Sequence, residues 1–143
     1  MNEFGLTFHH FGLAVQAPDT AFRYLAALGY RNGPPVFDPL QRVNLAMSWH
    51  DAMPDVEVIW PGDEPSPIDK MVKRNGTLIY HLCYIAPDPD ASLAAMAAAG
   101  FESLPVCPAQ PAILFDGREV SFHHVLDFGL IELIHGDMEP GRP

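Results

Sequence analysis

Two histidines and two glutamates occupy matching places in the two halves of this 143-residue sequence. His10 and His81 each stand at the edge of an apolar run, while Glu57 and Glu132 each lie between apolar residues, in VEVIWP and LIELIH. A carboxylate buried among apolar side chains is costly without a partner. Its pKa rises, or it binds a metal or another cation. One histidine in a strand is more often a structural residue, but two at equivalent positions are harder to explain in that way.

The equivalence comes from an internal repeat. When the sequence is shifted by 71 residues so that His10 lies over His81, HFGLAVQAPDTAFRYLAALGY aligns with HLCYIAPDPDASLAAMAAAGF without a gap. The histidine and the glutamate are 47 residues apart in the first copy and 51 apart in the second, which fits one loop insertion. Two such copies usually pack about a pseudo-twofold axis, and we therefore expect the two histidines to face each other.

Each copy is predicted to run as a strand, a loop, a helix and further strands. The helices are expected at 20–28 and 91–99, because both segments are rich in alanine and leucine. An aspartate and a neighbouring hydroxyl residue can cap the start of each helix, and a glycine can end it. The expected caps are Asp19 with Thr20 and Asp90 with Ser92, and the expected stops are Gly29 and Gly100.

The remaining segments are predicted from their alternation and their proline content. Alternating apolar and polar residues predict strands at 41–49, 55–61, 118–125 and 129–135. Proline-rich stretches predict loops at 34–39, 61–67 and 105–112. The run SPIDKMVKRNG predicts a short helix, with Ser66 as its N-cap and Gly76 as its stop, that links the two halves.

Composition limits the classes of partner. With 48% hydrophobic and 18% charged residues the chain is typical of an ordinary globular protein, and this length allows roughly 68% of the unfolded surface to be buried. A net charge of −10 disfavours nucleic acid and anionic membranes as partners. No secretion signal or membrane span is evident, so a cytoplasmic location is the default expectation. The two cysteines do not make a disulfide framework.

Four pieces of the sequence together resemble the vicinal oxygen chelate superfamily, which includes glyoxalases, bleomycin resistance proteins and dioxygenases. They are HHFGLAV, VEVIWP with SPIDKMVKRNG, IYHLCYI and FGLIELI, and within the superfamily they most resemble methylmalonyl-CoA epimerases. The resemblance covers roughly residues 8–135. It implies an α+β fold of two βαβββ modules whose sheets curl around a metal site. The chain would then be one domain over 1–143 and a homodimer, with modules at 7–62 and 77–136 and a linking helix at 66–76.

The resemblance also implies a ligand set, namely His10, Glu57, His81 and Glu132, which the repeat singled out independently. Imidazole nitrogens and carboxylate oxygens suit one divalent ion of Co, Mn, Ni, Zn or Mg. Two open positions would accept a substrate with two neighbouring oxygens, such as an acyl-CoA. The ion would stabilise the charge that forms when a proton leaves the adjacent carbon. Glu132 and Glu57, one on each face of that carbon, would be the catalytic bases of an epimerase or isomerase.

Other functions stay open, because one fold can support several chemistries. The same pair of acids would also serve a glyoxalase-like lyase acting on a thiol adduct. A metal-free, ligand-sequestering protein of the antibiotic-resistance type would need no ligand set. An extradiol-type dioxygenase would use two histidines and one carboxylate, and the acid at Glu57 argues against it.

Several other side chains have two interpretations. His123 and His124 are adjacent in a strand and therefore face opposite ways, so one of them can reach the cavity, although a polar residue at a strand edge is the commoner case. Cys83 faces the same way as His81 and is expected to be a small buried residue. The basic cluster of Lys70, Lys73 and Arg74 is either a solvated helix face or a binding site for the phosphates of a thioester.

Overall fold

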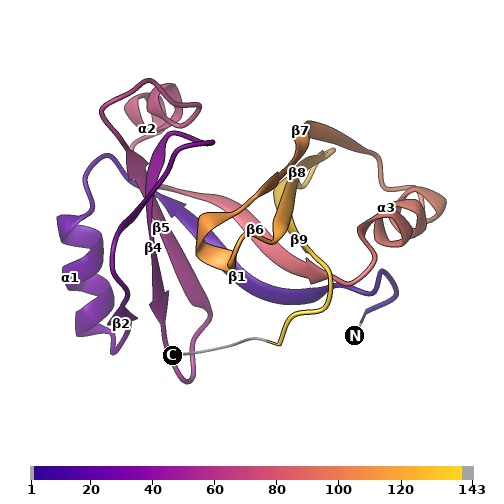
Figure 1. Cartoon of the computed structure of the whole chain (residues 1–143), viewed down its shortest axis with the longest axis horizontal. Helices are drawn as coiled ribbons and strands as arrows, with labels where there is room; N and C mark the ends of the chain where they lie inside the picture. The colour runs from indigo at the N-terminus through magenta and orange to yellow at the C-terminus, as the bar shows by residue number, and fades with distance from the viewer. Residues whose placement is uncertain (1, 140–143) are drawn as a thin grey trace. The chain divides into compact units, whose positions relative to one another are not determined.

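The structure, a computed structural model, describes residues 2–139 and contains two successive βαβββ modules (Figure 1). The first module comprises β1 (Thr7–Ala14), α1 (Asp19–Ala27), β2 (Arg31–Asn32), β3 (Val36–Asp38), β4 (Val43–Trp49) and β5 (Asp55–Pro61), and the short β2 and β3 together take one strand position, since both pair with β4. Helix α2 (Asp69–Asn75) follows it. The second comprises β6 (Leu78–Ala86), α3 (Pro89–Ala98), β7 (Ser103–Pro111), a 3-10 turn (Ile113–Phe115), β8 (Glu119–Val125) and β9 (Gly129–His135). The predicted α+β fold class is therefore confirmed.

The chain divides into two compact units. The N-terminal unit is His10–Tyr80, and the C-terminal unit consists of Met1–His9 together with His81–Pro143. The division falls within β1 and β6, directly before each of the two repeated histidines. Each unit consequently contains one histidine and one glutamate of the predicted set.

In the N-terminal unit the strands lie in the order β2, β4, β5 and β1, and β3 also pairs with β4. Strands β1 and β5 run parallel, whereas β4 is antiparallel to β5. Helix α1 covers one face of this sheet, where its Leu25 packs with Val15, Tyr30, Val56 and Val58. Because strand side chains alternate between faces, Glu57 points away from α1, in the opposite direction to its neighbours Val56 and Val58.

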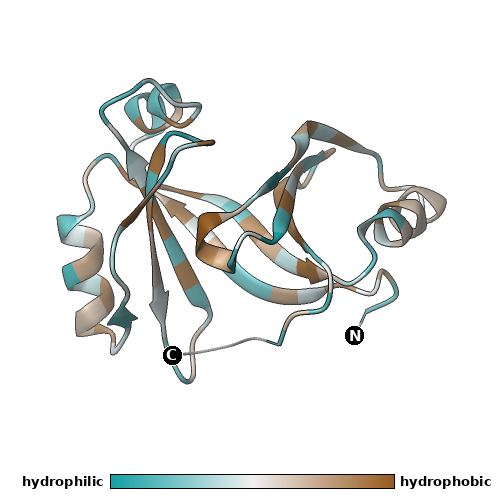
Figure 2. Ribbon diagram, in the orientation of Figure 1, coloured by the Kyte–Doolittle hydropathy of each residue, from teal (hydrophilic) through white to brown (hydrophobic). Residues whose placement is uncertain are grey.

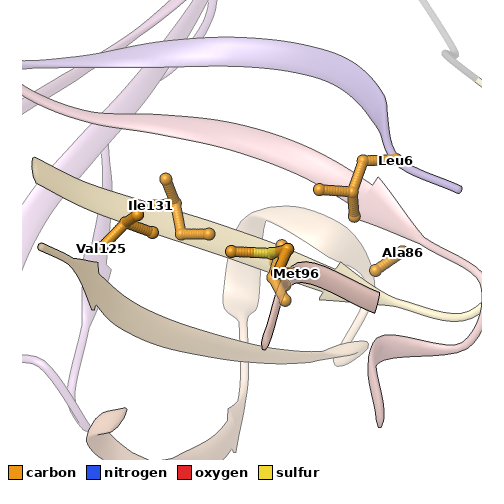
Figure 3. Packing of buried hydrophobic residues seen from close by; sticks show 6 residues of the cluster. Leu6, Ala86, Met96, Val125 and Ile131 are labelled. Atoms are coloured by element: carbon orange, nitrogen blue, oxygen red, sulfur yellow. The ribbon is translucent and has the colours of Figure 1, made fainter. Parts of the chain in front are cut away.

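In the C-terminal unit the strands lie in the order β6, β9, β8 and β7, with β6 parallel to β9. A hydrophobic cluster covers each face of this sheet. On the α3 face, shown in Figure 3, the cluster contains Leu6, Ala86, Met96, Val125, Ile131 and Leu133. On the other face it contains Cys83, Ala112, Phe115, Val120, Phe122 and Ile134. The second face is the one that carries Glu132, which alternates with Ile131 and Leu133 along β9.

The helices end as predicted but begin differently. Gly29 and Gly100 follow α1 and α3 with positive φ angles of 97° and 90°, as expected for the residue that ends a helix. The cap of α3, however, is Asp88, whose carboxylate accepts a hydrogen bond from Ala91 N, so the assignment of Asp90 was wrong. The ring of Pro89 fixes φ for the first turn, so the helix starts one residue earlier than Asp90.

The other predicted caps differ in similar ways. Helix α1 already includes Asp19, and its preceding residue, Pro18, makes no side-chain cap. The N-cap of α2 is Ile68 and not the predicted Ser66, and the helix begins at Asp69. Ser66 donates hydrogen bonds from both its backbone N–H and its hydroxyl to the Asp69 carboxylate. Gly76 ends α2 as predicted, with a φ angle of 71°.

The segment 105–112, predicted to be a loop, instead lies mostly in strand β7. Its prolines are tolerated because β7 is the last strand in the order and pairs only with β8. The pairing with β8 shifts register on either side of Cys107, which is the expected effect of residues that cannot donate a ladder hydrogen bond. Part of the predicted loop 34–39 likewise forms β3.

Figure 2 shows hydrophobic residues along the strands and a largely hydrophilic helix α2. Within residues 2–139, no helix has the length and apolar character needed to cross a bilayer.

Candidate metal-binding residues

His10 and Glu57 form a buried pair in the N-terminal unit. His10 Nε2 lies 3.8 Å from Glu57 Oε2, and the two residues are 0% and 5% exposed. The parallel pairing of β1 and β5 explains this contact, because Glu57 lies opposite Gly12, which follows His10 on the same face of β1. Gly12 has no side chain, so nothing from β1 stands over the carboxylate at this position. The strand register thus brings together two residues that are 47 positions apart.

His81 and Glu132 form the corresponding pair in the C-terminal unit. His81 Nε2 lies 3.0 Å from Glu132 Oε2, and both residues are 2% exposed. Here Glu132 lies opposite Cys83 in the parallel pairing of β6 and β9, and Cys83 follows His81 on the same face. The register of the second pair is therefore the same as that of the first. In this unit the residue beside the carboxylate is a fully buried thiol instead of a glycine.

An aromatic ring packs against His81. The ring of Phe122 meets it edge to face, with centroids 5.5 Å apart and an angle of 80° between the planes. Phe122 is also the residue of β8 that lies opposite Glu132. One apolar side chain therefore contacts the imidazole and stands beside the carboxylate. Sequence reasoning missed this role, and the alternation of Phe122 with Ser121 and His123 was the only available signal.

The donor atoms of both pairs fit a divalent cation. Each pair places an imidazole nitrogen and a carboxyl oxygen together in an environment with almost no access to water. A buried carboxylate requires a compensating charge or hydrogen bond. Nitrogen and oxygen donors in this combination suit the divalent metals of the borderline and hard classes.

The structure separates the roles of the two adjacent histidines on β8. His124 is exposed and lies on the same face as Phe122 and Glu132, with Leu130 as its partner across the ladder. His123 is buried on the opposite face. Of these two residues, His124 is consequently the one that shares a face with a predicted ligand.

His123 belongs to a separate polar group on the α3 face. Its Nε2 lies 2.9 Å from the hydroxyl of Ser121, and the same hydroxyl lies 2.7 Å from Nε2 of His135. The other ring nitrogen of His135 lies 3.9 Å from the Glu119 carboxylate. Burial, and to a lesser extent the nearby His135, lowers the pKa of His123. This group was not predicted, because Ser121 and His135 come together only through the register of β8 and β9.

The structure also places His9 and the basic cluster that were considered in the sequence. His9 packs edge to face against Phe115, with ring centroids 5.5 Å apart, in the C-terminal unit. Lys70, Lys73 and Arg74 are all exposed on α2, whose only buried residue is Val72.

Comparison with known proteins gives the family. The model of the glyoxalase/bleomycin resistance protein/dioxygenase superfamily matches residues 9–122, which is most of the chain. The chain belongs to this superfamily. The predicted resemblance is therefore confirmed at the level of the family, which contains both enzymes and binding proteins. A search of curated proteins gave no match.

Several solved structures share the fold. Methylmalonyl-CoA epimerase from Mycobacterium tuberculosis is similar with a TM-score of 0.74 and 22% identity, covering 92% of this chain and 88% of that one. A hypothetical protein from Bacillus halodurans C-125 gives 0.76 and 20%, with 96% and 99% covered. A variant of the Streptomyces coelicolor epimerase, in complex with 2-nitronate-propionyl-CoA, gives 0.71 and 22%, with 95% and 98% covered. Identities this low support the fold alone.

Proposed function

We propose that the two His–Glu pairs together hold one divalent metal ion, and that the protein is a metal-dependent epimerase or isomerase. The observation that carries this proposal is the recurrence of the same buried pair, in the same strand register, in both units. A structural role in one unit would not require the other unit to keep the same pair. A shared ligand set for one ion, with His10, Glu57, His81 and Glu132 as ligands, accounts for both.

The donor atoms of the four residues limit the range of candidate metals but do not identify one. Two imidazoles and two carboxylates favour Co, Mn, Ni, Zn or Mg over metals that prefer thiolate. Cys83 stands beside Glu132, but a thiol is not needed to complete such a set. When bound, the ion supplies Lewis-acid stabilisation of the negative charge that develops on the substrate oxygens as the neighbouring carbon loses its proton.

The protein's own side chains would move the proton. Glu132, as the carboxylate, is proposed to accept the proton from the carbon next to the carbonyl, and Glu57, as the carboxylic acid, to donate a proton to that carbon from the opposite face, so that the two acids exchange protonation states in each turnover. Nε2 of His81 and of His10 lies 3.0 and 3.8 Å from the carboxylate of its pair, so that each imidazole and each carboxylate can reach the same ion. The near-complete burial of all four side chains keeps bulk water out of the site during the transfer, and each acid exchanges its proton with solvent between turnovers.

The substrate is proposed to be a small molecule with two neighbouring oxygens, carried as an acyl-CoA thioester. Support comes from the basic residues of the N-terminal unit. Arg42 and Lys70 line a hollow of about 370 Å³ beside Ser66 and Asp69, and Lys73 and Arg74 lie in the last turn of the same helix as Lys70. Exposed cations grouped in this way can bind phosphate groups. We also propose that the chain forms one domain and that two copies associate as a homodimer, as the family resemblance implies.

The test combines metal analysis with proton exchange. Purified protein should contain, or bind at micromolar concentration, about one divalent ion per chain. With that ion bound, it should catalyse the incorporation of solvent deuterium next to the carbonyl of a branched acyl-CoA. A chain that binds no divalent ion would contradict the proposal and would favour a metal-free binding protein of the same superfamily.

A further inference from the structure

An apolar pocket of about 300 Å³ lies in the C-terminal unit, on the sheet face opposite His81 and Glu132. Its position follows from alternation, because Tyr84 follows Cys83 on β6 and Ile131 precedes Glu132 on β9. Figure 3 shows four of its lining residues, Leu6, Met96, Val125 and Ile131, between the sheet and α3. The complete lining is Asn2, Phe4, Leu6, Tyr84, Met96, Phe101, Val125, Phe128 and Ile131. None of these side chains is charged.

The N-terminal wall of the pocket is held in place by its own hydrogen bonds. The side chain of Asn2 donates to Leu6 O at 2.7 Å and accepts from the backbone N–H groups of Phe4 and Leu6. Phe4 in turn meets Phe101 edge to face, with centroids 5.9 Å apart. The wall that Phe4 and Leu6 provide is therefore formed before any ligand enters, which reduces the entropic cost of binding.

The rim of the pocket is aromatic and exposed to solvent. Phe101 is 51% exposed and Phe128 is 62% exposed. Exposed aromatic residues beside a concave apolar surface are typical of ligand-binding sites. The exposed rings of Phe101 and Phe128 thus offer aromatic surface at the mouth of the pocket.

We propose that this pocket binds a small aromatic molecule of about two rings that carries one hydroxyl group. The size follows from the volume, since an apolar cavity of about 150 Å³ accommodates benzene. The hydroxyl follows from the lining, in which Asn2 and Tyr84 are the only residues with strong hydrogen-bonding side chains. Asn2 makes three hydrogen bonds to the backbone and keeps one amide hydrogen, whereas the Tyr84 hydroxyl can both donate and accept, and we assign the ligand's hydroxyl to Tyr84.

Tyr84 has the protonation state that this role requires. Burial, with a smaller contribution from Cys83, raises the pKa of its hydroxyl above the usual value of 10.0. The group therefore stays protonated at neutral pH and can both donate and accept. The pocket is separate from the proposed metal site, so this inference stands independently of the proposed function.

Titration with 1-naphthol, followed by fluorescence and calorimetry, tests the proposal on the full chain. Wild-type protein should bind one molecule per chain, with saturation. Phe128→Asp, alone and with Phe101→Ser, should weaken binding by roughly tenfold or more, because each removes rim area from the bound ring. Ile113→Asp is the matched control, since Ile113 is 50% exposed in the same unit but does not line the pocket. It should bind like the wild type.

A comparison of two ligands tests the role of Tyr84. Tyr84→Phe should weaken 1-naphthol by roughly 2- to 10-fold, the loss expected for one hydrogen bond, and leave naphthalene binding unchanged. Equal effects on both ligands, or none on either, would overturn the assignment of the hydroxyl.

Two further results would overturn the proposal as a whole. One is the loss of 1-naphthol binding when divalent ions are removed with a chelator or when Glu132 is changed to Gln, because the ligand would then occupy the metal site. The other is the absence of saturable binding by the wild type, combined with conversion of a dimer to a monomer by Phe128→Asp in sedimentation. That combination would show that a second copy of the chain covers this face.

Discussion

The Glu132 carboxylate lies 3.0 Å from the His81 imidazole, and both side chains are almost completely buried. The equivalent contact between Glu57 and His10 is longer, at 3.8 Å. In both cases the residue two positions after the histidine lies directly opposite the glutamate on the parallel strand. The strand register thus determines the geometry of each pair, and the same register occurs in both units.

His81→Ala should affect both the metal affinity and the stability of the protein. The substitution removes one proposed ligand and leaves Glu132 buried without its imidazole, a situation that typically costs about 3–5 kcal/mol. The free energy of unfolding without metal should therefore fall substantially. Divalent metal should raise the melting temperature of the wild type much more than that of the variant.

His124→Ala is the control for this measurement, because His124 is exposed. It should keep the metal-dependent rise in melting temperature. If His81→Ala shows the same rise as the wild type, His81 is not a ligand.

The basic cluster on α2 predicts a specific kinetic effect. Changing Lys70, Lys73 and Arg74 to Ala should raise KM for a phosphate-bearing thioester with little change in kcat, because the cluster would bind a remote anion equally in the ground and transition states. Three exposed charge contacts suggest an increase on the order of tenfold. Arg23→Ala with Arg118→Ala, which removes exposed cations from other elements, should leave KM unchanged. An unchanged KM in the triple variant would show that the cluster is only a solvated face.

The cap of α3 gives a prediction about stability alone. Asp88→Ala removes the carboxylate that accepts from Ala91 N and should lower the free energy of unfolding by about 0.5–2 kcal/mol. Asp90→Ala, one residue into the first turn, should cost less, since it loses only a favourable charge near the helix N-terminus. Urea denaturation of the two variants compares them directly. An equal loss would contradict the assignment of Asp88 as the cap.

His123 predicts a dependence of stability on pH. Its pKa is lowered in the folded protein, so below the unfolded value of about 6.5 the unfolded chain binds more protons than the folded one. The folded protein holds His123 as the neutral imidazole. The free energy of unfolding is therefore unaffected by this residue above pH 6.5 and decreases as the pH falls from 6.5 toward the folded pKa. His123→Gln should flatten the fall in unfolding free energy between neutral and mildly acidic pH. His124→Gln, on the exposed side, should leave the slope unchanged.

The sequence predicted those features that depend on local pattern or on repetition. Strand 129–135 was predicted to the residue, because Glu132 lies between two apolar pairs in a run that begins at Gly129 and is followed by Gly136. Strand β7 was missed, because its prolines indicate a loop wherever the partner strand is unknown. The choice between His123 and His124 required knowing which face of β8 carries Phe122. The contact of Ser121 with His135 likewise depends on the pairing of two strands, which no local pattern specifies.

The four proposed ligands were singled out for a different reason, namely the two histidines by the repeat and the two glutamates by their places in the last predicted strand of each copy. A shift of the sequence on itself marks equivalent positions without any knowledge of pairing, and His10 and His81 coincide in it. The structure then adds the contact within each unit, which spacing alone could not give.

The most direct test of the central claim is deuterium incorporation by Glu132→Gln at saturating divalent metal, measured from each enantiomer of the substrate. The amide oxygen can still coordinate a metal, but it cannot accept a proton. The variant should therefore retain much of its metal and lose exchange by on the order of 10²–10⁴-fold. Glu57→Gln should slow exchange at one face of the carbon more than at the other. If Glu132→Gln binds metal and exchanges protons as fast as the wild type, Glu132 is not the base and the proposed mechanism is wrong.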